Sequence, residues 1–317
     1  MKSAHKKTIT YIFPIYNESK NIEILYKTIS ELLKPQTDYR FELIFINDGS
    51  TDSSLEKLLK IQNLDKRVIV INFARNFGHQ IAVTSGIDYA TGDAVIIMDS
   101  DMQDPPKVSL ELIKKWEEGY EVVYAQRRSR KDKKFKKITA HAYYWLLSRL
   151  TEIDIPRNTG DFRLIDRKVV DALKQFNEHN RFLRGLVSYI GFKQIAVPFD
   201  REARHAGVTG YPLKKMIRFA SDGIFSFSWT PLKLINRLGY TISGLSLLGI
   251  IYALFIKIFY PKNAVPGWTF IAISVLFVGG IQILILGVLG GYIGRIYTET
   301  QNRPLYIIEG VYKNRSA

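Results

Sequence analysis

The sequence contains no cysteine among its 317 residues. Disulfide bonds and thiolate-bound metal centres are therefore excluded, and the composition fits a reducing compartment. Histidine is also scarce, with five residues, and we find no spacing typical of a metal site. We accordingly assign no role to His79, His141, His179 or His205. A Walker loop and a Gly-x-Ser-x-Gly elbow are absent too, which argues against P-loop and serine-hydrolase chemistry.

Acidic residues are outnumbered, with 30 Asp and Glu against 45 Lys and Arg, which gives a net charge of +15. Such a charge fits binding to phosphorylated ligands or to an anionic membrane surface. Binding to nucleic acid is the usual alternative interpretation. We expect no nucleic acid partner, because apolar segments described next explain the basicity better. We also expect no cleavable signal peptide, since the apolar run after the basic Met1–Lys7 segment ends at Pro14.

Two long apolar stretches lie near the C-terminus, at residues 238–259 and 268–293. Each has about the 20 residues that a helix needs to span a bilayer. The residues between them, 260–267, form a short polar turn with two prolines. Basic residues flank the pair (Lys214, Lys215, Arg218, Lys233 and Arg237 before it, Arg295 and Arg303 after it), whereas the turn carries only Lys262. The positive-inside rule then predicts a multi-pass protein of the inner (plasma) membrane with both ends cytoplasmic.

We divide the chain into four parts. Residues 1–210 form a cytoplasmic catalytic domain, and 211–236, where basic and apolar residues mix, form juxtamembrane interfacial helices. Residues 237–296 form two transmembrane helices, and 297–317 form a tail whose strand at 304–311 returns to the catalytic domain. Residues 127–137 are strongly basic, either as a solvated loop or as a loop that meets phosphate. Glycines at 287, 290, 291 and 294 permit close helix packing within the hairpin or in a homo-oligomer.

The first hundred residues alternate between strand and helix patterns. Strands are expected at 8–14, 41–46, 68–73 and 94–98, and helices at 21–33, 53–61 and 80–90. This order predicts an α/β fold with a doubly wound, mostly parallel, Rossmann-like sheet. Ligands of such sheets bind beyond the carboxyl ends of the strands. Polar motifs follow each expected strand there, namely Tyr16-Asn17-Glu18, Asp48, Asn76 and Asp99.

Asp99-Ser100-Asp101 comes directly after an apolar strand and is followed by Gln103-Asp104-Pro105-Pro106. Two carboxylates with one spacer at a strand end can share a divalent cation with the phosphates of a nucleotide. Hard oxygen ligands suit Mg²⁺ or Mn²⁺. The motif therefore predicts that Asp99 and Asp101 bind one of these metals.

These motifs together resemble the inverting, GT-A-fold glycosyltransferases of family 2. More narrowly, they resemble the dolichol-phosphate-mannose-synthase-like branch, and the two-span bacterial form that is similar to bactoprenol glucosyltransferases fits best. The segments that carry the resemblance are Phe13-Pro-Ile-Tyr-Asn-Glu-Ser-Lys-Asn21, Asn47-Asp-Gly-Ser-Thr-Asp52, Arg75-Asn-Phe-Gly-His-Gln80, Met98-Asp-Ser-Asp-Met-Gln-Asp-Pro-Pro106, Asn158-Thr-Gly-Asp-Phe-Arg-Leu-Ile-Asp-Arg167 and residues 294–306. It extends over nearly the whole chain.

The resemblance implies a role for particular residues. Asp161 is the base candidate, which we interpret as orienting the acceptor or sugar at least as much as removing a proton, and Asp101 acts with it through the metal. The base and ribose of the nucleotide would be surrounded by Pro14, Tyr16, Asn17 and Glu18. The uracil or ribose would also be contacted by Asp48 and Ser50. The ribose and diphosphate would be contacted by Asp99, and the sugar by Gln103. Arg127, Arg163, Arg201 and Arg204 are the candidates for gripping the diphosphate and the acceptor phosphate.

Three positions depart from the family pattern. Asn47 stands where a first Asp is usual, Gly207-Val-Thr-Gly-Tyr211 lacks a lysine before the tyrosine, and Gly291 replaces a common glutamate. The Gln-x-x-Arg-Trp signature of processive polymerases is missing. The expected reaction is inverting transfer of one hexose, glucose from UDP-glucose, to undecaprenyl phosphate at the cytoplasmic membrane face. The alternatives are a GDP-mannose or UDP-aminopentose donor, or a non-catalytic membrane-tethered nucleotide-sugar-binding scaffold.

Overall fold

The structure is a computed structural model, and it describes residues 6–128, 156, 159–179, 181–200 and 267–314, together with single helical positions between 235 and 259. The first four strands of the chain, β1 (Thr8–Ile15), β2 (Arg40–Asn47), β3 (Val68–Phe73) and β4 (Ala94–Ile97), are parallel. β5 (Val122–Arg127), β6 (Thr159–Asp166), β7 (Gln194–Phe199) and β8 (Ile308–Lys313) complete one eight-stranded sheet. Its strand order is β7-β5-β6-β4-β1-β2-β3-β8.

The sheet is mixed, because β6 runs antiparallel to both β4 and β5, and β8 runs antiparallel to β3. The direction of β6 matters for the site. Since β6 runs opposite to β4, its first residues lie at the edge where β1, β2, β3 and β4 end. The doubly wound, mostly parallel α/β sheet expected from the sequence is therefore confirmed.

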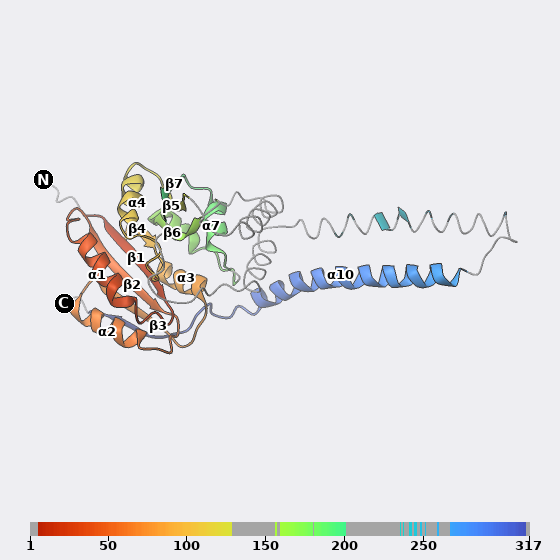
Figure 1. The fold of residues 1–317 in the computed structure, drawn as a ribbon, viewed down its shortest axis with the longest axis horizontal. Helices are drawn as coiled ribbons and strands as arrows, with labels where there is room; N and C mark the ends of the chain where they lie inside the picture. The colour runs from red at the N-terminus through yellow and green to blue at the C-terminus, as the bar shows by residue number, and fades with distance from the viewer. Residues whose placement is uncertain are drawn as a thin grey trace.

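Helices cover both faces of the sheet (Figure 1). On one face lie α1 (Ile22–Leu33), α2 (Ser54–Leu64) and α4 (Val108–Glu117), which pack Leu25, Leu58 and Leu112 against alternate strand residues such as Phe13 and Phe45. On the other face lie α3 (His79–Tyr89), α6 (Arg167–Leu173) and α7 (Leu183–Ile190). Central strands that are buried on both faces consist of continuous apolar runs, which explains their composition.

The apolar periodicity explains how well the element boundaries are predicted. The seven strands and helices expected between residues 8 and 98 all form, and each boundary lies within three residues of its expected place. The largest difference is at α2, which continues to Leu64 because Ile61 is still buried in the core and the chain turns only at Asp65.

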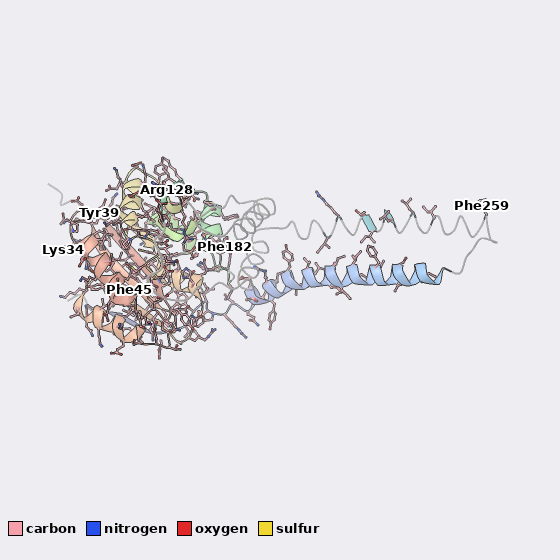
Figure 2. The ribbon with its side chains drawn as sticks, viewed as in Figure 1. Lys34, Tyr39, Phe45, Arg128, Phe182 and Phe259 are labelled. Atoms are coloured by element: carbon pink, nitrogen blue, oxygen red, sulfur yellow. The ribbon has the colours of Figure 1, made fainter. Side chains whose placement is uncertain are left out.

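The C-terminal part consists of one long helix and the strand β8. Helix α10 (Trp268–Thr300) extends away from the domain (Figure 1), and its side chains project into open space (Figure 2). Ile271 and Leu286, for example, are 62% and 65% exposed, whereas Phe45 is fully buried inside the domain. Within α10, Phe277–Thr300 has the length and apolar composition to cross a membrane, and it is the one such helix among the described residues. The chain then returns, and β8 pairs with β3.

Several expectations fall outside the described residues. These are the interfacial helices at 211–236, nearly all of the first apolar stretch at 238–259, the basic loop beyond Arg128, and Arg201 and Arg204. The described part of the chain thus gives no support to a multi-pass topology, since it contains a single candidate span. The domain boundaries proposed from the sequence remain predictions.

Candidate active site

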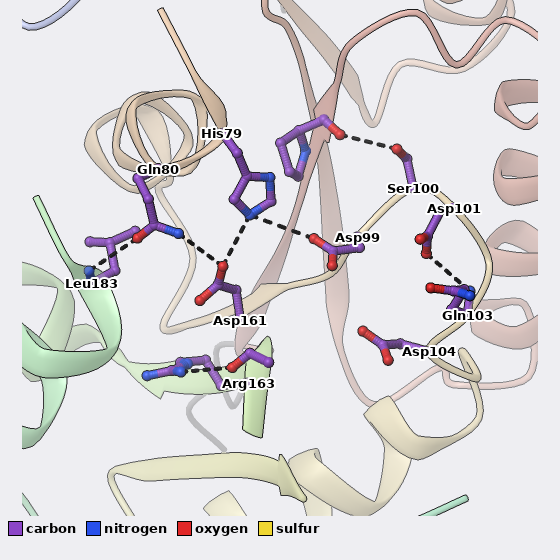
Figure 3. A network of polar contacts seen from close by, with 12 residues as sticks. His79, Gln80, Asp99, Ser100, Asp101, Gln103, Asp104, Asp161, Arg163 and Leu183 are labelled. Carbon is purple, nitrogen blue, oxygen red and sulfur yellow. Dashed lines mark hydrogen bonds and ion pairs between the residues drawn. The ribbon is translucent and has the colours of Figure 1, made fainter. Parts of the chain in front are cut away.

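The loop after β4 brings three carboxylates to the carboxyl edge of the sheet. Ser100 Oγ donates to the carbonyl of Pro14 at 3.1 Å and ties this loop to the end of β1 (Figure 3). Asp101 Oδ1 accepts a hydrogen bond from the backbone N–H of Gln103 at 3.1 Å, across a tight turn in which Met102 has a positive φ of 58°. Asp101 and Asp104 are 8% and 1% exposed, whereas the side chain of Asp99 is 30% exposed.

The ends of β1 and β2 form a second loop pair. The Asn17 N–H donates to Ser50 Oγ at 3.0 Å, and Asn17 Oδ1 accepts from the Thr51 N–H at 2.8 Å. The Glu18 N–H donates to Ser54 Oγ at 3.1 Å. Asn17 adopts a left-handed conformation with φ 54°, and Tyr16 beside it is 49% exposed. Residues expected to surround a nucleoside are therefore brought together, with Tyr16 presenting its ring to the outside.

Asp48 holds the loop after β3. Its Oδ1 accepts from the Phe77 N–H at 2.7 Å, and its Oδ2 accepts from the Gly78 N–H at 3.0 Å and from Asn76 Nδ2 at 2.9 Å. Asp48 is 3% exposed. Both carboxylate oxygens thus fix the residues that lead into α3, and the expected contact of Asp48 with uracil or ribose stays a prediction.

Asp161, the third residue of β6, lies at the centre of a polar network (Figure 3). Its Oδ2 is 3.1 Å from His79 Nε2 and accepts from Gln80 Nε2 at 2.9 Å, and its Oδ1 is 3.2 Å from Arg184 Nε. Gln80 is itself oriented by the Leu183 N–H, which donates to its Oε1 at 3.1 Å. His79 Nε2 also lies 3.7 Å from Asp99 Oδ1. The imidazole therefore connects the β4 loop to Asp161.

The electrostatics of this network favour charged forms. Burial lowers the pKa of His79, but the hydrogen bond to Asp161 and the charge of Asp99 outweigh burial and raise it to about 9. Burial likewise opposes ionisation of Asp161, yet Arg184, His79 and Arg163 hold its pKa well below the usual range. At neutral pH the pair is an imidazolium and a carboxylate.

Asp99 behaves differently. Burial raises the pKa of Asp99, and the charges of Asp161 and Asp101 add to burial, while His79 opposes them. Among the described residues, no group donates a hydrogen bond to Asp99 Oδ1, which is buried. Carboxylates that repel one another in this way gain from a shared cation. No group of three or more His, Cys, Asp or Glu side chains that could hold a metal ion occurs in the described part of the chain.

Two of the four predicted arginines are described. Arg127, at the end of β5, places Nη2 at 3.8 Å from Asp104 Oδ1 and lies against Gly160, where an added Cβ would come within 3.2 Å of the same Nη2. Arg163 is 5% exposed, and its Nη2 donates to the Gly160 carbonyl at 3.0 Å. Arg127 is thus next to the carboxylate loop, whereas Arg163 is buried behind Asp161.

A cavity of about 490 Å³ opens beside these loops, where β1, β2 and β3 end. It is lined by Tyr16, Asn47, Ser50, Asn72 and Arg75, and also by Glu309 of β8. Its size is within the range of about 300–1,000 Å³ that is usual for small-molecule pockets.

Comparison with known proteins identifies the class of protein to which the chain belongs. The family model described as Glycosyl transferase family 2 matches residues 10–174. The chain belongs to this family and is a glycosyltransferase, and its mixed eight-stranded sheet is of the GT-A type.

Named relatives and a solved structure are also similar. An uncharacterized glycosyltransferase of Bacillus subtilis, YkcC, is 51% identical over 95% of this chain and 93% of its own length. The bactoprenol glucosyl transferase of Shigella phage SfX is 39% identical over 95% of this chain and 98% of its own. The crystal structure of glucosyl-3-phosphoglycerate synthase from Mycobacterium tuberculosis, in complex with Mn²⁺ and UDP-glucose, has a TM-score of 0.44 and 18% identity, and it covers 69% of this chain and 77% of the other.

The structure adds three residues that the sequence interpretation missed. His79, to which the sequence analysis assigns no role, contacts Asp161 and approaches Asp99. His79 and Gln80 open α3 just after the β3 edge, so the rule that places ligands beyond strand ends could have found them. Arg184 lies in the first turn of α7, 23 positions from Asp161, and no local pattern marks it.

Proposed function

We propose that this protein transfers a single glucose from UDP-glucose to a polyprenyl (undecaprenyl) phosphate at the cytoplasmic face of the inner membrane, with inversion at the anomeric carbon. The observation that carries the proposal is the Asp161 network beside the carboxylate loop, at the same edge of the sheet where a cavity of about 490 Å³ opens. The bactoprenol acceptor and the glucosyl group are inferred from relatives named bactoprenol glucosyl transferase, which match over almost their full length.

A divalent cation, Mg²⁺ or Mn²⁺, fits the residues present. Asp99 has a buried oxygen that accepts no hydrogen bond from a described residue, and Asp101 lies two positions further on the same loop. Mg²⁺ is often held by one or two carboxylates together with substrate phosphates. Asp99 and Asp101 would hold the ion, and it would stabilise the charge of the departing diphosphate.

The acceptor needs little help to become a nucleophile. A phosphate monoester has a second pKa of about 6, so it is largely a dianion at neutral pH. One of its oxygens forms a bond to the anomeric carbon while the bond from that carbon to the diphosphate oxygen breaks, and the electron pair leaves with UDP. No proton has to be removed in this step. Arg127 lies beside the carboxylate loop, where its guanidinium would bind the diphosphate.

Asp161 then acts as a fixed negative charge. Because Arg184 and His79 keep its pKa well below the usual range, it is a weak proton acceptor. A carboxylate held in place can orient a sugar hydroxyl and stabilise the positive charge that develops at the anomeric carbon. This favours the orienting role over the role of general base.

Helix α10 supplies the attachment to the membrane. It has the length and apolar composition of a span over Phe277–Thr300, and it exposes large apolar side chains such as Ile271, Ile283 and Ile293. Arg295 lies in the last turns of α10 and Arg303 follows its end, and this end of α10 is the one next to the catalytic domain (Figure 1). By the positive-inside rule this end, and therefore the active site, faces the cytoplasm.

A transfer assay tests the proposal. The full-length protein in detergent is given Mg²⁺, undecaprenyl phosphate and one radiolabelled donor at a time: UDP-glucose, UDP-galactose, UDP-N-acetylglucosamine, a UDP-aminopentose or GDP-mannose. We expect lipid-extractable label from UDP-glucose, and only when lipid phosphate is present. Label from another donor would correct the sugar. Absence of label from every donor, with nucleotide binding intact, would contradict the proposed reaction.

A further inference from the structure

The cavity beside β1, β2 and β3 has one wall that comes from far along the chain. Glu309 belongs to β8, which follows the apolar helix α10, yet it lines the same cavity as Asn47 and Ser50 of the β2 end. The pairing of β8 with β3 explains how it gets there. Asn72 pairs with Gly310 and Phe73 pairs with Ile308, so the register shifts and Glu309 is the extra residue of a β-bulge. Bulges redirect the side chain of the extra residue, often near active sites.

A hydrogen-bond chain leads from Glu309 to two buried residues that also line the cavity. Asn72 Nδ2 donates to Glu309 Oε2 at 2.7 Å, and Asn47 Nδ2 donates to Asn72 Oδ1 at 2.7 Å. Asn47 and Asn72 are 2% and 4% exposed, whereas Glu309 is exposed. An ionised carboxylate can only accept hydrogen bonds, so Glu309 determines which way both amides point. The bulged strand thus orders the polar groups of this wall.

The charge of the cavity wall defines what it can recognise. Among the described residues that line the cavity, Glu309 is the one that carries a carboxylate, and Arg75, whose Nη1 donates to the Asn76 carbonyl at 3.1 Å, is the one that carries a positive charge. A carboxylate attracts N–H and O–H donors and repels phosphate. A nucleoside offers such donors at two places, the ring N–H of the base and the ribose hydroxyls.

We propose that Glu309 is a nucleoside-binding residue, which the strand beyond the apolar helix contributes to the donor site through its bulge. This inference rests on the proposed use of a nucleotide sugar. It assigns to β8 a part in donor recognition in addition to its place at the sheet edge. Removing Glu309 is expected to weaken the nucleoside contact and to leave the phosphate contacts unchanged.

Binding of nucleotides to the full-length protein in detergent, measured by calorimetry, tests this. The ligands are UDP, UMP, N3-methyl-UDP and 2′-deoxy-UDP. For Glu309→Ala we expect weaker binding of UDP and UMP by the same factor, about tenfold or more, as for a lost hydrogen bond to a charged group. The wild type should discriminate against whichever analogue lacks the donor that Glu309 contacts, and the variant should lose that discrimination.

Two further variants make the result specific. Glu118→Ala removes an exposed glutamate at the end of α4 and should bind all four ligands as the wild type does. Glu309→Gln removes the charge but keeps the size of the side chain and an oxygen that can accept a hydrogen bond from Asn72. If Glu309→Ala folds poorly, nucleotide binding by Glu309→Gln therefore tests the proposal. The inference is overturned if Glu309→Gln and Glu309→Ala keep wild-type affinities and discrimination, or if UDP binding weakens while UMP binding does not. A wild-type protein that binds no UDP would instead contradict the proposed donor.

Discussion

At the level of single residues, the contacts of Asp161 support the proposal that it acts as an orienting charge and not as a proton acceptor, two roles that the sequence leaves open. Arg184 approaches one of its oxygens, and His79 and Gln80 approach the other. A group with this many donors is stabilised as an anion. Its folded-state pKa is depressed, so Asp161 is ionised throughout the range from about pH 5 to 8.

We therefore expect Asp161→Asn to lower kcat by about 10²–10³-fold, the usual cost of losing one electrostatic contact to a transition state. The dissociation constant for UDP should stay within about threefold. Steady-state transfer kinetics and calorimetry measure the two quantities. In the wild type, the rate between pH 5 and 8 should show no acidic limb due to Asp161. Equal losses of turnover and UDP binding would make Asp161 a structural residue.

Asp101 gives a second prediction at this scale. If Asp99 and Asp101 share a cation with the diphosphate, Asp101→Asn should weaken Mn²⁺ binding in the presence of UDP and abolish metal-dependent turnover. Titration of Mn²⁺ followed by electron paramagnetic resonance measures the first effect. Asp171→Asn, at an exposed position of α6 whose side chain is 61% exposed, is the matched control. Near-normal activity of the Asp101 variant would refute the metal assignment.

At the level of elements, the sequence predicts what is local. Apolar runs such as residues 94–97 and the polar residues directly after them indicate both the strands and the edge where ligands bind. The sequence does not predict which residues far apart along the chain contact each other in the fold. His79 and Asp161 are 82 positions apart, and Asn72 and Glu309 are 237 apart. These pairs depend on how β6 and β8 align with their neighbours, and strand pairing is not encoded in any short segment.

Gly49 shows how closely two of these loops approach each other. It has φ 64°, and a Cβ added there would lie 2.3 Å from the carbonyl carbon of Arg75 and 2.5 Å from the Asn76 nitrogen. Gly49→Ala is expected to push the β3 loop away from the β2 loop and to lower the free energy of unfolding by more than about 2 kcal/mol. Thermal unfolding of the full-length protein measures this.

Gly119 is the matched control for Gly49. It also has a positive φ, of 92°, but nothing lies within 4 Å of its Cβ position. Gly119→Ala therefore carries the backbone strain without the collision and should cost about 1 kcal/mol. UDP binding should weaken in Gly49→Ala alone. Equal effects of the two substitutions on stability and on UDP affinity would show that the close approach is unimportant.

At the level of the whole molecule, His179 connects the catalytic domain to the end of α10. Its Nδ1 lies 2.9 Å from Glu299 Oε2, and its Nε2 lies 2.6 Å from the carbonyl of Arg303. Both neighbours are acceptors, so the arrangement is complete only when both ring nitrogens carry protons. The hydrogen bonds to Glu299 and the Arg303 carbonyl raise the pKa of His179, against burial and the charge of Arg181. Glu178 is the other charged group next to Glu299.

A pH-dependent junction follows from this contact. Because the folded-state pKa of His179 is raised, its stabilising effect is fully present below the unfolded value of about 6.5 and is lost as pH rises through the folded value. We expect hydrogen exchange at residues 301–303, corrected for intrinsic rates, to become roughly fivefold faster across this range, which corresponds to about 1 kcal/mol. In His179→Gln the corrected exchange should be fast at every pH. Persistence of the pH dependence in this variant would assign it to another group.

The position of β8 in the chain also has a consequence for the order of folding. Ribosomes release the N-terminal part of a protein first, and domains tend to fold as they emerge. Here β3 acquires its outer neighbour only after α10 has been synthesised, since β8 follows that helix. Until then β3 is an uncovered edge strand, which is prone to pair with other chains. If α10 enters the bilayer as we propose, a delay in its insertion would leave β3 uncovered for longer, and we expect the delay to appear as aggregation of the catalytic domain.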